Sequence, residues 1–152
     1  YGAAHEGAAW QHSTEYHVMW RVAFEPGEVK VVARKDGKQV GEQTIRTAGA
    51  PHHIVLKKTY QGTLAFGTSD PTTFVEVQVV DKDGNLCPNA DNQIFFSSDA
   101  KILGTDNGCQ TSLERFTDPH RKAFFGKCVV VLKGKGTLTA KAVDLQQAQI
   151  QL

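Results

Sequence analysis

The sequence predicts an all-β protein: an immunoglobulin-like β-sandwich preceded by a partial β-sandwich or β-sheet unit. Two observations support this fold class. Apolar and polar residues alternate with a period of two along most of the 152 residues, as in half-buried strands. Turn residues such as Asp-Gly and Gly-Lys-Gly separate these short segments, which is typical of sandwiches. No long window has the periodicity of an amphipathic helix.

The first part of the chain contains about three expected strands. The first of them has one large apolar face, made by Tyr16, Val18, Trp20, Val22 and Phe24. Strands over residues 29–33 and 39–47 follow, joined by Asp36-Gly37, a dipeptide typical of tight hairpins. So few strands cannot cover this face. We expect upstream residues, the second part of the chain or a second copy to cover it, the last giving a homo-oligomer.

Ala48-Gly49-Ala50-Pro51 is the best candidate for a domain boundary, because it is short, small and ends in proline. We therefore expect residues 1–50 to form a partial immunoglobulin-like unit and residues 51–152 a complete sandwich. The expected strands of the second part cover residues 53–57, 72–80, 93–97, 100–103, 122–125, 127–133, 136–143 and 147–152. The loop over residues 104–120 is about 17 residues long, enough to indicate a purpose.

Composition and charge exclude several partners. A net charge of +1 provides no field for nucleic acid or anionic lipid, and no stretch approaches the roughly 20 apolar residues of a membrane span. The chain begins with neither Met nor a secretory leader, so we expect it to be part of a longer protein. The basic residues of the last third are expected on the solvated face of a sheet rather than in an anion site: Lys127, Lys133, Lys135 and Lys141.

Cysteine and histidine spacing predicts no metal site, and we expect no cofactor. There is no Cys-x-x-Cys pair, which disfavours a zinc knuckle. Cys128 lies in an apolar strand and is expected in the core, whereas a disulfide between Cys87 and Cys109 is a minor alternative. His52 and His53 are adjacent, so on a strand they are expected to point to opposite faces.

Asp81-Lys-Asp-Gly-Asn85 resembles the start of a calcium-binding loop. Asn92 stands where such a loop needs glutamate, and both flanks are expected strands. A hairpin turn is therefore the preferred interpretation.

Eight phrases carry a family resemblance through their order and spacing. In the first part they are Tyr16-His-Val-Met-Trp-Arg-Val22, Phe24-Glu-Pro-Gly27, Val31-Val-Ala-Arg-Lys-Asp-Gly37 and Arg46-Thr-Ala-Gly-Ala-Pro51. In the second they are Val77-Gln-Val-Val-Asp-Lys-Asp-Gly-Asn85, Pro88-Asn-Ala-Asp-Asn92, Gly104-Thr-Asp-Asn-Gly108 and Arg121-Lys-Ala-Phe-Phe-Gly-Lys127. Residues 15–152 thereby resemble the C-terminal β-domains of glycoside hydrolase family 2 enzymes, mostly β-galactosidases of gut Bacteroidetes type.

The resemblance implies a structural, accessory tail of a retaining exo-glycosidase, with the parent's catalytic barrel as partner. It also implies a periplasmic or extracellular location. The family's first such domain begins with strands upstream of the position of Tyr16, so that domain is truncated here. No position matches the glutamate pair on the family's barrel, and no acidic residue stands out as one of the close carboxyl pair that this chemistry needs. We therefore predict no catalytic residue.

Two alternative functions are a carbohydrate-binding module and a cell-surface adhesion-type immunoglobulin-like domain. Sugar-binding modules use exposed aromatic platforms helped by polar side chains. Trp20 belongs to the alternating apolar face and is expected in a core. Trp10 lies outside any periodic strand, and Asp106 and Asn107 lie in the long loop, so these three are the candidate sugar contacts.

Overall fold

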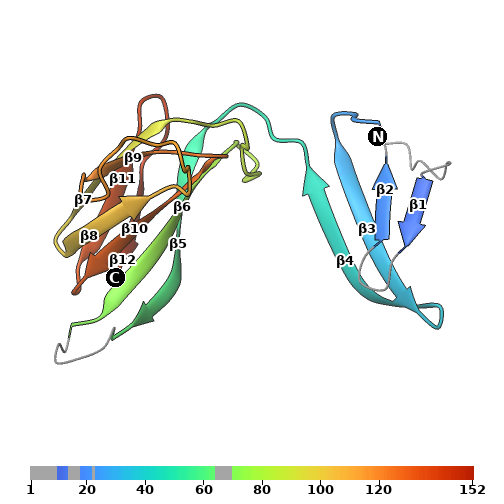
Figure 1. Cartoon of the computed structure of the whole chain (residues 1–152), viewed down its shortest axis with the longest axis horizontal. Coiled ribbons are helices and arrows are strands. Elements are labelled where there is room, and N and C mark those ends of the chain that lie inside the picture. Colours follow the sequence, from blue (N-terminus) through green and yellow to red (C-terminus); the bar gives the residue numbers. More distant parts are fainter. Residues whose placement is uncertain (1–9, 14–17, 22, 64–69) are drawn as a thin grey trace. The chain divides into compact units, whose positions relative to one another are not determined.

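The computed structural model describes residues 10–13 and 18–21 by their backbone, and residues 23–63 and 70–152 with their side chains. Every regular element in these ranges is a β-strand, which confirms the all-β prediction (Figure 1). The chain divides into two compact units, Tyr1–Thr47 (unit 1) and Ala48–Leu152 (unit 2). A search of the described residues finds no helix with the length and hydropathy of a membrane span.

In the described part of unit 1 the strands form two antiparallel pairs. One joins β1 (Trp10–Ser13) with β2 (Val18–Arg21), and the other joins β3 (Glu28–Lys35) with β4 (Lys38–Arg46). β1 lies where we expected no strand, so the placement of Trp10 outside any strand is wrong; four residues show too few alternations to be detected. Asp36 and Gly37 adopt φ angles of 51° and 75°, which confirms the tight hairpin between β3 and β4.

The β3–β4 hairpin has one charged and one apolar face. The charged face carries two cross-strand ion pairs, Lys30–Glu42 at 2.8 Å and Arg46–Glu28 at 2.6 Å. On the apolar face Val29 lies opposite Ile45, and these residues are 52% and 68% exposed. Self-association through unit 1 stays a prediction.

Unit 2 is a sandwich of two four-stranded sheets. Its strands are β5 (His53–Gly62), β6 (Thr72–Val80), β7 (Gln93–Ser98), β8 (Lys101–Asp106), β9 (His120–Lys122), β10 (Lys127–Lys133), β11 (Thr137–Lys141) and β12 (Ala148–Gln151). One sheet has the order β5-β6-β10-β8 and the other β12-β11-β7-β9 (Figure 1). Across one sheet, β5, β6, β10 and β8 take the places of immunoglobulin strands A, B, E and D; across the other, β12, β11 and β7 take those of G, F and C. The immunoglobulin-like prediction is therefore confirmed.

Alternate residues of the central strands fill the space between the sheets. The apolar residues with no exposed surface are Val75, Val77, Val79, Ile94, Val130, Leu132, Leu138 and Ala140. Each valine, leucine and isoleucine among them stabilises the fold by about 1.5–3 kcal/mol relative to an exposed one. Cys128 is buried among them, as expected, and all three cysteines are free.

The long loop is shorter than expected. β8 continues to Asp106 and β9 begins at His120, so the loop that joins them covers residues 107–119 (the 107–119 loop). Because β8 and β9 belong to different sheets, this loop crosses from one sheet to the other at one edge of the sandwich.

The expected strand over residues 122–125 is wrong, since β9 ends at Lys122 and a tight turn follows. Phe125 and Gly126 occupy the turn with φ angles of 49° and 74°. A Cβ at Gly126 would also collide with the Cys87 carbonyl oxygen. Phenylalanine is common in strands, so the two consecutive phenylalanines led to the prediction of a strand where the chain turns.

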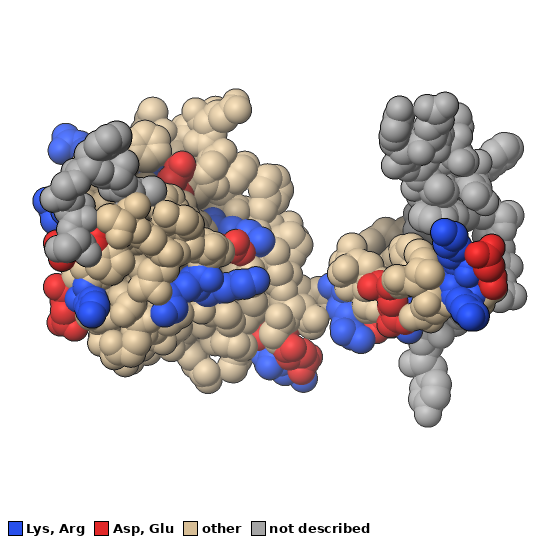
Figure 2. Space-filling model, turned by 90° about the horizontal axis from the view of Figure 1, so that it is seen from below, with Lys and Arg blue, Asp and Glu red and all other residues tan. Residues whose placement is uncertain are grey.

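Lys127 and Lys133 of β10 and Lys141 of β11 lie on outward positions of the sheets. Lys135 was also expected there, but it lies in the turn between these strands. Lys127 Nζ lies 3.0 Å from Glu76 Oε1 on the neighbouring strand. Figure 2 shows basic and acidic side chains interspersed over the face that it draws. Both observations favour a solvated sheet face over an anion site.

Candidate functional site

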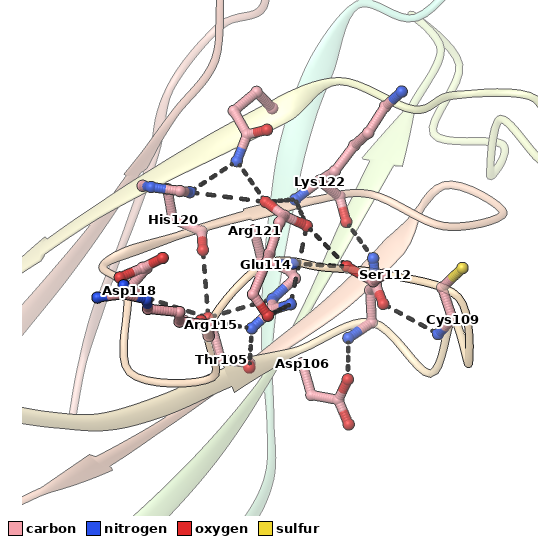
Figure 3. Close-up of polar contacts among 12 residues, drawn as sticks. Thr105, Asp106, Cys109, Ser112, Glu114, Arg115, Asp118, His120, Arg121 and Lys122 are labelled. Carbon is pink, nitrogen blue, oxygen red and sulfur yellow. Dashed lines mark hydrogen bonds and ion pairs between the residues drawn. The ribbon is translucent and has the colours of Figure 1, made fainter.

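The densest group of polar contacts that the structure describes surrounds the 107–119 loop (Figure 3). The loop is joined to β8 by a backbone hydrogen bond, in which Thr105 N donates to Phe116 O at 2.7 Å. Turns within the loop are closed by Ser112 N to Cys109 O and by Asp118 N to Arg115 O. The loop is therefore an ordered part of the sandwich.

Arg121 of β9 holds this loop from inside. Its side chain is only 1% exposed and reaches from β9 to Thr105 of β8, a strand of the opposite sheet. Nη2 donates to Thr105 O at 2.7 Å and to Arg115 O at 2.9 Å, while Nη1 donates to Glu114 O at 3.2 Å. A buried guanidinium is costly unless its donors are satisfied, and here they bind carbonyls of both β8 and the loop. Arg121 thus closes the sandwich edge and shapes the loop.

Glu114 turns its carboxylate inward beneath the loop. It accepts hydrogen bonds from Gln93 Nε2 at 2.9 Å and from the backbone N–H of Lys122 at 3.1 Å, and it lies 3.7 Å from Arg121 Nη1. Burial alone would raise the pKa of Glu114, but the bonds from Gln93 and Lys122 together with Arg121 hold its pKa below the usual value. Glu114 is therefore an ionised structural acceptor.

Asp106 and Asn107 cap the start of the loop. Asp106 Oδ1 accepts the N–H groups of Asn107 and Gly108 at 2.7 and 3.1 Å. Asn107 Nδ2 donates to Lys122 O at 2.8 Å, and its Oδ1 accepts the Cys109 N–H at 2.9 Å. These bonds give both side chains a structural role, and sugar contact stays a prediction. The side chain of Trp10 lies outside what the structure describes, so it is not placed beside the other two.

The thiols of unit 2 differ in their acidity. Burial raises the pKa of Cys128 to about 12, and it also raises the pKa of Cys87. Hydrogen bonding from Thr111 lowers the pKa of Cys109, whose Sγ lies 3.4 Å from the threonine Oγ1.

Among the described residues the carboxyl groups do not have the acidity pattern of a glycosidase. Every carboxyl whose pKa clearly departs from its usual value is lowered: Glu42, Glu76, Asp81, Asp91 and Glu114. A retaining glycosidase needs a second carboxyl with a raised pKa to act as the acid.

The part of the chain that the structure describes holds no group of three or more His, Cys, Asp or Glu side chains that could bind a metal ion. The expectation that His52 and His53 point apart is wrong, since their Nδ1 atoms lie 3.1 Å apart. His52 precedes β5, so the alternation of a strand does not govern its direction.

A second polar group anchors the connection between the units at its unit 2 end. The buried Asp81 carboxylate accepts four hydrogen bonds: from Gly49 N, Asp83 N, Asn85 N and Asn85 Nδ2, at 2.8 to 3.0 Å. The Gly49 and Asn85 bonds, in that order, lower the pKa of Asp81 well below its usual range. Because N–H donors occupy both oxygens of this carboxylate, the structure supports a hairpin turn rather than a calcium loop.

Sequence reasoning gave Arg121 no role of its own. The available signal was alternation: Arg121 shares a strand face with buried Ala123, while His120 and Lys122 face the other way. An arginine at an inward position of a strand, next to a long loop, indicates that its guanidinium binds the carbonyls of that loop.

Comparisons with known proteins assign this fold to a family. Residues 56–151 match the family described as Glycoside hydrolase family 2 C-terminal domain 5, and residues 2–41 match a Domain of unknown function (DUF4982). Beta-galactosidase BoGH2A of Bacteroides ovatus is 47% identical over 143 residues, which are 90% of this chain and 17% of that protein.

Solved structures agree. A beta-glycosidase from Bacteroides vulgatus matches with a TM-score of 0.79 and 31% identity, over 93% of this chain and 19% of its own. A glycosyl hydrolase family 2 member from Bacteroides cellulosilyticus matches with a TM-score of 0.76 and 27% identity, over 89% of this chain and 19% of its own. The chain therefore spans about a fifth or less of the length of these relatives.

Proposed function

Because the chain belongs to the glycoside hydrolase family 2 C-terminal domain 5 family, we propose that it is a non-catalytic accessory region of a β-galactosidase-like enzyme of carbohydrate degradation. The observation that carries this proposal is the 47% identity, across 90% of the chain, to a stretch that makes up 17% of a β-galactosidase. The chain would then be covalently joined to the parent's catalytic barrel and would support it.

The electrostatics of the described residues support a non-catalytic role. Their shifted carboxyls are all more acidic than usual, so none of these is poised to protonate a leaving group at neutral pH. The buried Arg121 and the half-buried Glu114 have their charged groups bonded to other parts of the fold.

An activity assay tests the proposal. We expect the 152-residue chain to show no turnover of nitrophenyl β-galactoside above the buffer blank, and the full-length parent to hydrolyse it. Turnover that co-purifies with the chain would contradict the non-catalytic role. A full-length protein inactive on β-galactosides and on other chromogenic glycosides would contradict the proposed parent activity.

Carbohydrate contact through Trp10, Asp106 and Asn107, and a periplasmic or extracellular location, stay predictions. All the relatives described above are glycoside hydrolases, which favours an accessory role over a cell-surface adhesion domain.

A further inference from the structure

We propose that Leu113 and Phe116 on the 107–119 loop form a docking surface for a neighbouring domain of the same polypeptide. This inference rests on the proposed function, in which the chain is one region of a longer hydrolase. Four features support it. The two side chains are exposed, the loop holds them in place, the loop surface carries little charge, and the apolar area is small.

The two side chains are open to solvent although the loop is ordered. Leu113 is 99% exposed and Phe116 is 65% exposed. Scattered apolar side chains are common on protein surfaces, so exposure alone would carry little weight. Here Leu113 and Phe116 belong to one loop whose backbone is fixed by several hydrogen bonds.

The loop displays these residues in a fixed position. Glu114, directly after Leu113, is bound to Gln93 and Lys122, and the Phe116 carbonyl accepts the Thr105 N–H at 2.7 Å. The Phe116 ring also lies 5.4 Å from the guanidinium carbon of Arg121, which is buried and cannot swing away. A partner therefore meets a preorganised surface and loses little conformational entropy on binding it.

The outer surface of the loop is almost uncharged. Its exposed residues are Gly108, Gln110, Thr111, Leu113, Arg115, Phe116, Thr117 and Pro119, of which only Arg115 is charged. The one acidic side chain between Leu113 and Phe116 is turned inward. Interface cores are depleted in acidic residues and lysine and enriched in aromatic residues and arginine, which matches this surface. The partner surface should be apolar, with an oxygen acceptor for Arg115.

The size of the surface indicates a tethered partner rather than a second copy. Two large apolar side chains offer roughly 300–400 Å² of contact, whereas each side of a stable dimer needs about 800 Å². A domain of the same polypeptide is already present at high effective concentration, so a small contact suffices. Most of the related β-galactosidase lies outside the matching 17% and could supply such a domain.

Hydroxyl-radical footprinting with residue-level mass spectrometry tests the proposal in two proteins, the 152-residue chain and the full-length polypeptide. We expect oxidation of Leu113 and Phe116 to be slower in the full-length protein by about tenfold, because a docked surface excludes water. Val143, which is 75% exposed and lies outside the loop, is the matched control and should react equally in both.

Equal rates at Leu113 in the two proteins would overturn the proposal. Protection that appears in the 152-residue chain as its concentration rises would also overturn it, in favour of a second copy. Glycosidase activity is measured on the same full-length sample. Protection without turnover would refute the proposed function and retain the docking surface, whereas turnover without protection would refute only the docking surface.

Discussion

Arg121 is the residue on which the edge of the sandwich depends. Its guanidinium binds the carbonyls of Thr105, Glu114 and Arg115, so one side chain joins β8, the loop and β9. Removing it would leave these carbonyls and the Glu114 carboxylate without their buried cation.

We therefore expect Arg121→Met to lower the free energy of unfolding by several kcal/mol, at about 1–3 kcal/mol for each buried acceptor left without its donor. Chemical denaturation of the 152-residue chain measures this change. Arg115→Met is the matched control, because that side chain is exposed and only its carbonyl takes part. Equal losses in the two variants would contradict the role of the buried guanidinium.

Asp81 is the second residue on which the stability of the fold depends, and its contribution varies with pH. Its folded-state pKa lies below its unfolded value, about 3.9. Ionised Asp81 therefore stabilises the fold above that pH, and this stabilisation is lost as the pH falls through the folded pKa.

We expect the stability of the protein to decline as the pH falls below about 4, and the decline to be shallower in Asp81→Asn, which has no carboxylate to protonate. Denaturant unfolding from pH 7 to pH 2 measures both slopes. Asp83→Asn, at an exposed position of the same turn, should retain the steeper slope. If the Asp81 variant keeps that slope too, its carboxylate is not the group responsible.

At the scale of elements, β10 carries the centre of the sandwich. It lies between β6 and β8, and its residues alternate between core and outer face. Val130 and Leu132 have no exposed surface.

Leu132→Ala should lower the free energy of unfolding by about 2–5 kcal/mol, through lost burial and a residual cavity. In the 152-residue chain the control Leu113→Ala should change it by less than about 0.5 kcal/mol, since Leu113 is 99% exposed. Thermal and denaturant unfolding of both variants give the comparison. A loss at Leu113 as large as that at Leu132 would show that the loop residue is packed.

At the scale of the whole molecule, the apolar core that the described side chains form lies in unit 2. Every member of the core cluster, and every apolar residue packed against it, lies between Ala48 and Leu152. The Gly49–Asp81 contact lies within the same range.

A fragment of residues 48–152 should therefore fold alone and unfold in one cooperative transition, detected by circular dichroism during heating. A fragment that melts gradually, or that shows no sheet signal, would mean that unit 2 needs residues 1–47.

Sequence reasoning succeeded where a local pattern suffices. β6 and β10 match their expected limits of 72–80 and 127–133, because each alternates clearly and ends at turn residues. It failed where local propensity and global packing disagree. Phe125 adopts a left-handed conformation in the turn into β10, where Gly126 passes close to Cys87, a contact distant in sequence. His52 lies beside His53 because β5 begins at His53, so His52 is not part of the strand.

The amino-acid pattern alone predicted an all-β, sandwich-type chain, because alternation and turn chemistry are local, and the order and spacing of short phrases carried the family resemblance. Only the tertiary structure shows how the 107–119 loop is held. Its order depends on Arg121 meeting carbonyls from a strand of the opposite sheet, and its outer surface depends on Glu114 turning inward. Such contacts join residues that the fold, and not the order of the chain, brings together.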